Sequence, residues 1–457
     1  MTERRNSIGL AFPGLLLTML MGALDQTIMA PALPSVARDL GGLEQMPAVV
    51  TAYLAAATVV MPVYGKLGDR FGRKPVIQVA LGVFVTGAVL CGLAESMPQL
   101  VVFRALQGVG GGGLMIGAQA IIGELVSPRE RGRYLGYIGA GYMVAAVGGP
   151  LIGGVFVDQW GWRWIFAIYP PLGLLAFAVL TATLRLPRPT GGAPIDYPGA
   201  VTLGAAVVGV VLLGQTGDPR WLVLALLGTA AWLLTARRAV DPILPLRLFA
   251  DRGFAIPVAI SFLIGFALFG TVTYLPAFLR IVLHVSATRS GIVVTALMAG
   301  VLLTTVVSGR LITRTGRYKG YPVAGTAVAA LGLVLLGVVG GRGGVSALVG
   351  VMLLIGLGVG LVMQVMVLAT QNSVAYADLG AATSSVTFLR QIGASVGVAV
   401  VGALITWRLA EPGGAGAAEA VPVVFAMMAP LLVVAFGLAV ALPARPLRTT
   451  AHVEERL

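Results

Sequence analysis

The sequence predicts an all-α membrane protein of fourteen transmembrane helices, arranged as two six-helix bundles with two inserted helices. Three observations support this prediction: a low charge content, a series of long apolar runs and an internal repeat. Of the 457 residues, 58% are hydrophobic and only 11% are charged, whereas soluble domains carry about 25% charged residues. Lipid is therefore the expected solvent for most of the chain, and the 63 glycines suit closely packed membrane helices.

The apolar runs are long enough to cross a bilayer, which requires about 20 predominantly apolar residues in a helix. The seventh and eighth runs are short, and Gly217-Asp218-Pro219 separates them. The candidate spans are 8–33, 46–65, 75–95, 98–124, 134–157, 163–184, 197–215, 219–236, 253–280, 289–312, 320–340, 345–370, 382–407 and 421–443.

The net charge of +13 is explained by the loops between these spans. With a cytoplasmic N-terminus, most Lys and Arg residues fall in the two termini and the cytoplasmic loops, as the positive-inside rule requires. We therefore expect both termini in the cytoplasm, a multi-pass location in a bacterial inner membrane, and no nucleic-acid partner. The first apolar run is long for a signal peptide and contains Asp25, so no cleavable signal is expected.

An internal repeat divides the chain into related halves. Residues 65–73 align without gaps with residues 309–317, and the same offset of 244 positions carries Gly149 to Gly393. Six helices with short loops need fewer residues than this offset, which leaves room for about two more helices. The predicted units are an N-terminal bundle (1–190), two inserted helices with a linker (191–252), a C-terminal bundle (253–443) and a tail (444–457).

Several segments resemble the fourteen-helix drug:proton antiporter branch of the major facilitator superfamily, and the resemblance covers nearly the whole chain. The segments are Gly65–Lys74, Gly148–Gly154, Leu24–Ile28 with Ala32–Pro34, Trp162–Phe166 and Phe388–Gly393. One departure is Tyr169, where members of the branch often have Asn. The resemblance implies the major facilitator fold, alternating access, and proton-coupled antiport that exports lipophilic, neutral or cationic small molecules.

Asp25 is the only acidic residue near the middle of a predicted span. A charge at mid-bilayer costs about 2.5–3.5 kcal/mol on insertion scales, so such a residue usually faces water or a partner. We expect Asp25 to bind the coupling proton, a cationic substrate, or both in turn. A capping or packing Asp near the outer interface is the alternative, because Pro31 and Pro34 follow soon after.

Two arginines also lie inside predicted spans. Arg104 resembles the family's helix-four Arg, which is implicated in proton transfer; since Arg keeps its proton, its role would be to hold a carboxylate ionised. Snorkelling of Arg104 to the outer interface is the alternative. For Arg390 we hypothesise a charge pair with Asp25 that joins the two halves in one conformational state of the transport cycle. The alternative is a local partner, such as Gln391 or helix-end carbonyls.

The loop between the second and third spans contains a motif that, by resemblance, latches the cytoplasmic side in the outward-open state. Glycines in it permit close backbone approach and positive φ, and Asp69 can accept hydrogen bonds or cap a helix of the other half. Thr313 replaces Asp69 in the second copy, so an asymmetric latch is expected. The latch residues are Gly65, Gly68, Asp69, Arg70, Gly72, Arg73 and Arg131.

The segment in the fifth span resembles the motif associated with antiporters. Gly149 and Gly153 lie four residues apart on one helix face, which allows intimate helix packing. By resemblance, we expect this face to form a dry seal and hinge between the halves. The motif residues are Gly148, Gly149, Pro150, Gly153 and Gly154.

The chain has no catalytic constellation, no His/Cys metal set and no phosphate-binding Gly-rich loop. We therefore expect a secondary active transporter rather than an enzyme, driven by the proton gradient and without a cofactor. The expected partners are a lipophilic small molecule and membrane lipids, and a monomer is expected. The alternatives are transport of a lipid, siderophore or specific metabolite on the same fold, a non-transporting membrane sensor, and a channel.

Overall fold

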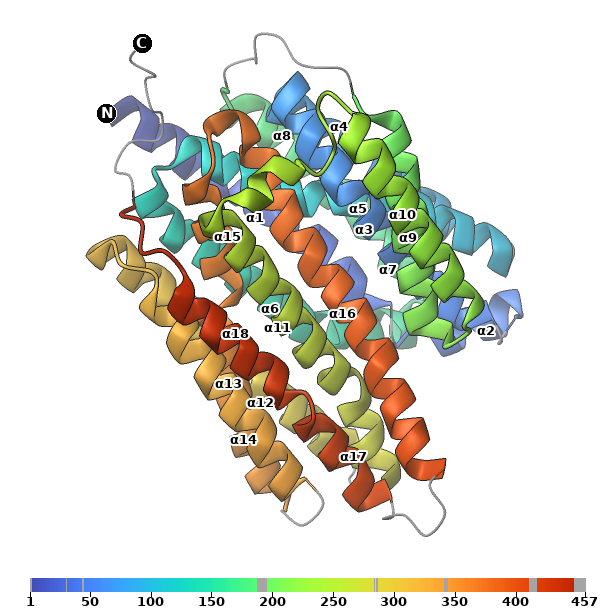
Figure 1. Ribbon diagram of the computed structural model, residues 1–457. Coiled ribbons are helices and arrows are strands. Elements are labelled where there is room, and N and C mark those ends of the chain that lie inside the picture. Colours follow the sequence, from blue (N-terminus) through green and yellow to red (C-terminus); the bar gives the residue numbers. More distant parts are fainter. Residues whose placement is uncertain are drawn as a thin grey trace.

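The computed structural model of the chain is helical throughout its described residues, which are 2–29, 31–42, 45–186, 195–282, 284, 287–340, 344–410 and 417–447 (Figure 1). Fourteen helices in these residues are long and apolar enough to cross a membrane, which confirms the predicted number of spans. The predicted boundary at residues 190 and 191, and the tail beyond residue 447, lie outside the described residues.

The helices follow one another with short connections. Their bounds are α1 (Thr2–Ile28), α2 (Leu33–Leu40), α3 (Met46–Phe71), α4 (Arg73–Gly92), α5 (Met97–Leu125), α6 (Pro128–Gln159), α7 (Trp164–Ala167), α8 (Tyr169–Thr183), α9 (Tyr197–Thr216), α10 (Arg220–Arg238), η2 (Leu246–Ala250), α11 (Arg252–Ala277), η3 (Phe278–Val282), α12 (Ala287–Thr315), α13 (Gly320–Val339), α14 (Val345–Gly360), α15 (Met363–Ser373), η4 (Tyr376–Asp378), α16 (Leu379–Ala410), α17 (Ala417–Ala426) and α18 (Ala429–Ala441).

Helix is the structure expected here, because a chain in lipid must satisfy its backbone hydrogen bonds within each segment. The ends of several helices are capped by side chains: Ser127 accepts from Glu130 N, Asp196 from Gly199 N and Asp251 from Gly253 N. The first span is shorter than predicted and ends at Ile28. Pro34 instead occupies the first turn of the separate helix α2, where its missing N–H costs nothing.

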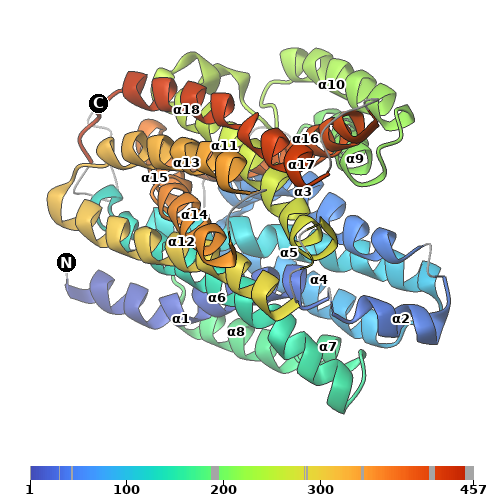
Figure 2. The same cartoon turned by 90° about the horizontal axis from the view of Figure 1, so that it is seen from below.

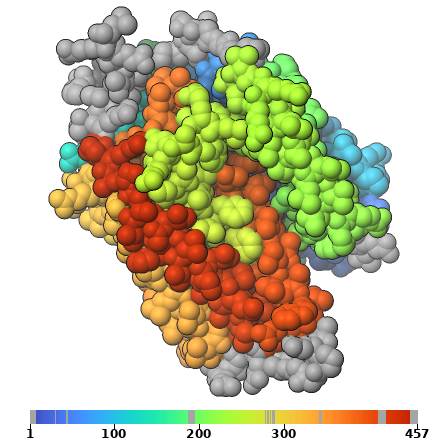
Figure 3. Space-filling view, viewed as in Figure 1, coloured from blue at the N-terminus to red at the C-terminus, as the bar shows by residue number. Residues whose placement is uncertain are grey.

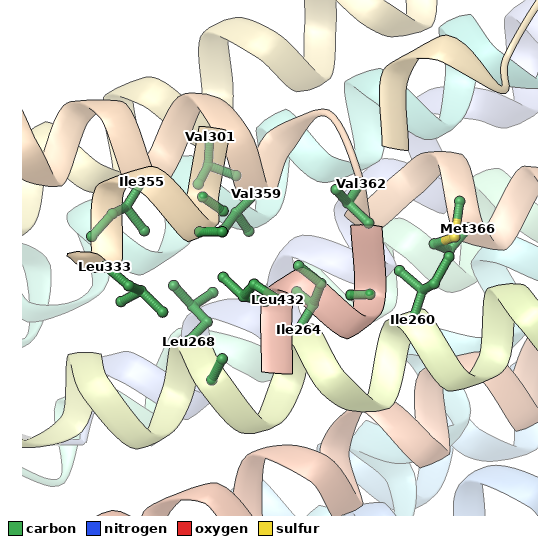
Figure 4. Close-up of a cluster of buried hydrophobic side chains, with 14 of the residues drawn as sticks. Ile260, Ile264, Leu268, Val301, Leu333, Ile355, Val359, Val362, Met366 and Leu432 are labelled. Carbon is green, nitrogen blue, oxygen red and sulfur yellow. The ribbon is translucent and has the colours of Figure 1, made fainter. Parts of the chain in front are cut away.

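Each half of the chain has its own apolar core. One core gathers side chains of α1, α3, α4, α5, α6 and α8, and another gathers mainly those of α11 to α18, joined by Leu135 and Met143 of α6. In the second core, Ile264 and Leu268 of α11 lie close to Leu432 of α18 (Figure 4). Viewed from below, the helices of the N-terminal half lie beside those of the C-terminal half as two neighbouring groups (Figure 2).

The two inserted helices, α9 and α10, form a hairpin on one side of the molecule. Of this pair, α9 packs against both α3 of the first half and α16 of the second. Leu203 and Val207 of α9 share an apolar cluster with Met61 of α3 and Phe388 of α16. The pair therefore covers a seam between the halves, and Figure 3 shows it as a layer on the outside of the bundle.

Candidate functional site: a latch between the halves and a buried ion pair

The halves touch through glycine backbones at one end of the bundle, which we call the latch end because residues 65–74 lie there. A Cβ atom on Gly65 would lie 2.7 Å from the carbonyl oxygen of Gly380, and a Cβ on Gly136 would lie 3.6 Å from the Cα of Gly309. The repeat offset of 244 positions relates Gly65 to Gly309 and Gly136 to Gly380. The α3–α16 and α6–α12 contacts are therefore pseudo-equivalent.

Asp69 connects the halves at this end. Its carboxylate accepts hydrogen bonds from the backbone N–H groups of Gly380 and Ala381, both at 2.9 Å, at the start of α16. A carboxylate at a helix N-terminus satisfies otherwise unpaired donors and interacts favourably with the helix dipole. This is the capping contact with the other half that the sequence predicted.

Arg73 holds Asp69 in place. One guanidinium nitrogen, Nη2, lies 2.7 Å from Asp69 Oδ1, and Nη1 lies 2.6 Å from Glu124 Oε2 at the end of α5. Gly72 permits the turn that brings Arg73 back, with φ at +90°, and Gly316 adopts φ of +71° at the equivalent place in the repeat. Arg131 donates to the carbonyl groups of Gly123 and Val126 and so ties the start of α6 to the end of α5.

Replacing Asp69 by Ala is expected to lower transport about tenfold, because it removes two backbone hydrogen bonds across the halves and one ion pair. Transport rates in proteoliposomes, normalised to folded protein, provide the measurement. The matched control is Thr313→Ala at the equivalent position of the repeat, where the hydroxyl bonds only its own helix at Gly309 O. Equal losses in the two variants would contradict an asymmetric latch.

The linker between the inserted pair and α11 also reaches both halves at the latch end, which the sequence did not indicate. Asp241 forms an ion pair with Lys66 of α3, and Arg247 Nη2 lies 2.6 Å from Asp378 Oδ1 just before α16. Asp251 accepts two hydrogen bonds of 2.8 Å from Arg445. Burial alone would raise the pKa of Asp251, but the Arg445 guanidinium and the Gly253 N–H hold it below its usual value.

Asp25 lies in a second site, wholly inside the N-terminal half. Its Oδ2 lies 2.6 Å from Nη1 of Arg104, and its Oδ1 accepts a hydrogen bond of 2.9 Å from Nε2 of Gln107. Arg104 also donates to Gln107 Oε1 at 2.8 Å. Both charged side chains are about 1% exposed. The structure thus shows a carboxylate of α1 and a guanidinium of α5 paired in the protein interior.

Aromatic and polar groups surround this ion pair. The Arg104 guanidinium lies 4.4 Å from the ring centre of Tyr53, whose hydroxyl donates to the carbonyl of Gly22. The buried Tyr169 lies in the same site. The sequence had marked Tyr169 only as a departure from the family pattern, and it had not singled out Gln107 as a partner of Asp25. The Asn-to-Tyr departure therefore falls beside the candidate proton site.

The hypothesised pair between Asp25 and Arg390 is not formed in this structure. Asp25 is bound by Arg104 and Gln107 of its own half, while Arg390 lines a cavity between the halves. The physical reason is that α5 packs directly against α1 and places its arginine beside the carboxylate. Asp25 is likewise not among the residues that line this central cavity.

The antiporter-type segment packs differently from the expectation. A Cβ atom on Gly149 would lie 2.0 Å from Thr27 Oγ1, and one on Gly153 would lie 2.4 Å from the carbonyl oxygen of Ile28. Both glycines therefore fit against α1 of the same half. Pro150 is exposed, and nothing lies within 4 Å of a Cβ on Gly154. The seal between the halves is made instead by the latch-end glycines of the same helix α6, near Gly132 and Gly136.

Gly148 likewise has little packing around it, since the nearest atom to its Cβ would be a side-chain carbon of Ile152 on its own helix, 3.9 Å away. In the second half, Gly393 and Gly397 fit against Phe262 and Phe266 of α11. The two glycine pairs therefore have equivalent roles, each joining two helices within one half.

Two helical halves with a central cavity between them, closed at one end by glycine contacts and a capped helix, define a membrane transport protein. The Major Facilitator Superfamily profile matches residues 15–398 and 258–456. The chain belongs to the Major Facilitator Superfamily, a family of transporters.

Related proteins support this assignment. The chain is 39% identical over 437 residues to an uncharacterized MFS-type transporter of Mycobacterium tuberculosis (strain ATCC 25618 / H37Rv), covering 92% of this chain and 62% of that protein. The chain therefore spans less than two thirds of the length of that relative. It is 36% identical over 409 residues to the multidrug transporter protein MdtP of Bacillus subtilis (strain 168), covering 87% and 75% of the two chains.

A solved structure, that of the proton:xylose symporter XylE, shares the fold with a TM-score of 0.67. The match covers 96% of this chain and 97% of that chain at 16% sequence identity. At this identity the likeness establishes the fold alone.

Proposed function

We propose that this chain is a proton-driven antiporter that exports lipophilic small molecules from a bacterial cell. The observation that supports proton coupling is the Asp25–Arg104 pair, a titratable carboxylate held inside the membrane-spanning part of the N-terminal half. The multidrug transporter relative in Bacillus subtilis supports efflux of varied compounds. In this proposal the proton gradient is the only energy source, and no cofactor takes part.

The ion pair gives protonation a mechanical consequence. Arg keeps its charge, so a proton on Asp25 weakens the attraction between α1 and α5. Arg104 then retains Gln107 Oε1, the Val49 carbonyl at 3.5 Å and the Tyr53 ring. Because α1 is a partner of α6, and α6 contacts α12 of the other half, a shift of α1 reaches the contact between the halves.

The latch end corresponds to the cytoplasmic side in this proposal. The ends of α8 and α18 lie there, since Lys74 donates to the carbonyl of Leu184 and Tyr318 to that of Pro443. Arg and Lys residues concentrate at this end, as expected for cytoplasmic loops. The described conformation, with the latch formed, then corresponds to a state closed to the cytoplasm.

One copy of the chain is sufficient for this cycle, because both walls of the central cavity come from it. We propose that the monomer works in the inner membrane and takes its substrates from the cytoplasm or the surrounding lipid.

The test is transport in proteoliposomes under an imposed pH gradient, with an enclosed pH-sensitive dye that reports proton movement. Three other dyes serve as transported probes: the anion 1-anilinonaphthalene-8-sulfonate, the neutral N-phenyl-1-naphthylamine and the cation ethidium. We expect at least one probe to move against protons, with both fluxes stopped by nigericin. Dye movement at the same rate without a gradient would refute proton-driven antiport.

A further inference from the structure

The central cavity lies between the halves and is lined from α1, α5, α6, α11, α12, α15 and α16. Its polar lining consists of Gln119, Tyr142, Thr305, Gln364, Thr387 and Gln391, together with the single charged residue Arg390. None of the residues that line this cavity is acidic. Met19, Met115, Met143, Met363 and Phe269 supply an apolar wall. The cavity therefore combines a flexible apolar surface with one positive charge.

Arg390 is buried without a counter-ion. It is 9% exposed, its Nη1 has no hydrogen-bond partner, and it forms no ion pair with any residue that the structure describes. Tight packing fixes its position, because a Cβ on Gly265 of α11 would lie 2.2 Å from the Arg390 carbonyl oxygen. A buried guanidinium cannot discharge by losing its proton, and leaving it unpaired is energetically unfavourable. Such a group is a ready site for an anion.

A second polar atom in the cavity has no partner. Oε1 of Gln364 on α15 is buried and accepts no hydrogen bond within the described chain. A ligand with an anionic group and a nearby hydroxyl or N–H satisfies both atoms at once. The cavity has a volume of about 30 Å³ in this conformation, room for no more than a few water molecules. A larger ligand therefore enters when the halves separate, as alternating access provides.

We propose that Arg390 binds the anionic group of an amphipathic organic anion, such as an aromatic carboxylate or sulfonate, and that this class of compound is the preferred cargo. The proposal rests on the proposed export function and narrows its substrate class. The methionine and phenylalanine side chains contact the apolar part of the anion, and Gln364 accepts a hydrogen bond from a donor on it.

Equilibrium binding to the purified chain in nanodiscs tests the proposal. The probes are 1-anilinonaphthalene-8-sulfonate and N-phenyl-1-naphthylamine, which differ by one sulfonate group, with empty nanodiscs subtracted. We expect the wild type to prefer the sulfonate. Arg390→Gln is expected to weaken sulfonate binding by about tenfold or more, as loss of a charge-assisted contact predicts, while binding of the neutral dye changes less than about twofold.

The matched control is Arg408→Gln, near the end of the same helix α16 and outside the cavity. It should leave both affinities unchanged, and Arg390→Lys should restore part of the preference. Equal losses for both dyes in Arg390→Gln, or no preference in the wild type, would overturn the proposal.

A measurement on the wild type alone covers the case in which Arg390→Gln does not fold. We expect 2-naphthoate to displace the bound sulfonate dye and its uncharged methyl ester to displace it far less; equal displacement would contradict an anion site. Binding needs no proton gradient, so a failure of the anion site can be distinguished from a failure of proton-driven antiport in the flux assay. A selective anion site without proton counterflow would refute the antiport mechanism and leave this inference intact.

Discussion

Replacing Asp25 by Asn is expected to reduce gradient-driven transport to the level of protein-free liposomes. The neutral amide takes up no coupling proton. The proton gradient, whose electrical part is worth about 2.3 kcal/mol per charge for each 100 mV, therefore cannot drive the transport cycle. Exchange of labelled for unlabelled substrate without a gradient should persist, because Asp25 does not line the central cavity. The measurement compares the two assays on the same preparation.

The substitution also leaves Arg104 buried without its carboxylate. Removing one partner of a buried ion pair typically destabilises a protein by about 3–5 kcal/mol. The double variant Asp25→Asn with Arg104→Gln removes both charges and should recover thermal stability while gradient-driven transport remains absent. This pair of results separates a coupling role from a purely structural one.

The matched control for Asp25 is Asp218→Asn. Asp218 lies in the turn between α9 and α10, where it pairs with the exposed Arg220. Because surface ion pairs contribute about 0–1 kcal/mol, this control should transport at the wild-type rate. Full proton-coupled transport by Asp25→Asn would refute the assignment of Asp25 as the coupling group.

Gly309→Val is expected to abolish transport by preventing closure of the latch end. A Cβ atom at this position would lie 2.3 Å from the carbonyl oxygen and 3.1 Å from the carbonyl carbon of Gly132 on α6. These are backbone atoms of a helix in the other half, so the steric clash is relieved only if α12 moves away from α6. Spin labels at positions 133 and 315, in a Cys91→Ala background, should report a longer distance across the latch end.

Gly291→Val on the same helix is the control, because no atom lies within 4 Å of a Cβ at that site. It should retain transport and the wild-type label distance. If Gly309→Val also kept the short distance and normal transport, closure of the halves through α6 and α12 would not be part of the cycle.

Much of the latch was predictable from the sequence because its parts are local. Asp69 and Arg73 are only four residues apart, Gly72 supplies the positive φ at the break between α3 and α4, and Thr313 marks the weaker copy. The sequence predicted that Asp69 could cap a helix of the other half, but not that this helix is α16 at Gly380, since that depends on how α16 docks against α3.

The site around Asp25 was predictable only in part. An acid within an apolar run indicates a buried cationic partner, but both Arg104 and Arg390 lie within predicted spans and were candidates for that partner. The packing of α1 against α5 made Arg104 the partner of Asp25. The packing of α16 against α11 left Arg390 facing a cavity that no acidic residue lines. The packing of α6 against α1 likewise placed Gly149 and Gly153 against α1 rather than against the other half.

The sequence by itself determined the fourteen helices, long and apolar enough to cross a membrane, that the described residues contain, and it showed that the halves repeat. Those properties follow from local hydrophobicity and backbone hydrogen bonding, which each segment carries alone. Only the tertiary structure decided which charges meet and which stand alone, and where the inserted pair α9 and α10 docks. Electrostatic energy depends on distance and burial, and helices far apart in the chain acquire both only when they pack.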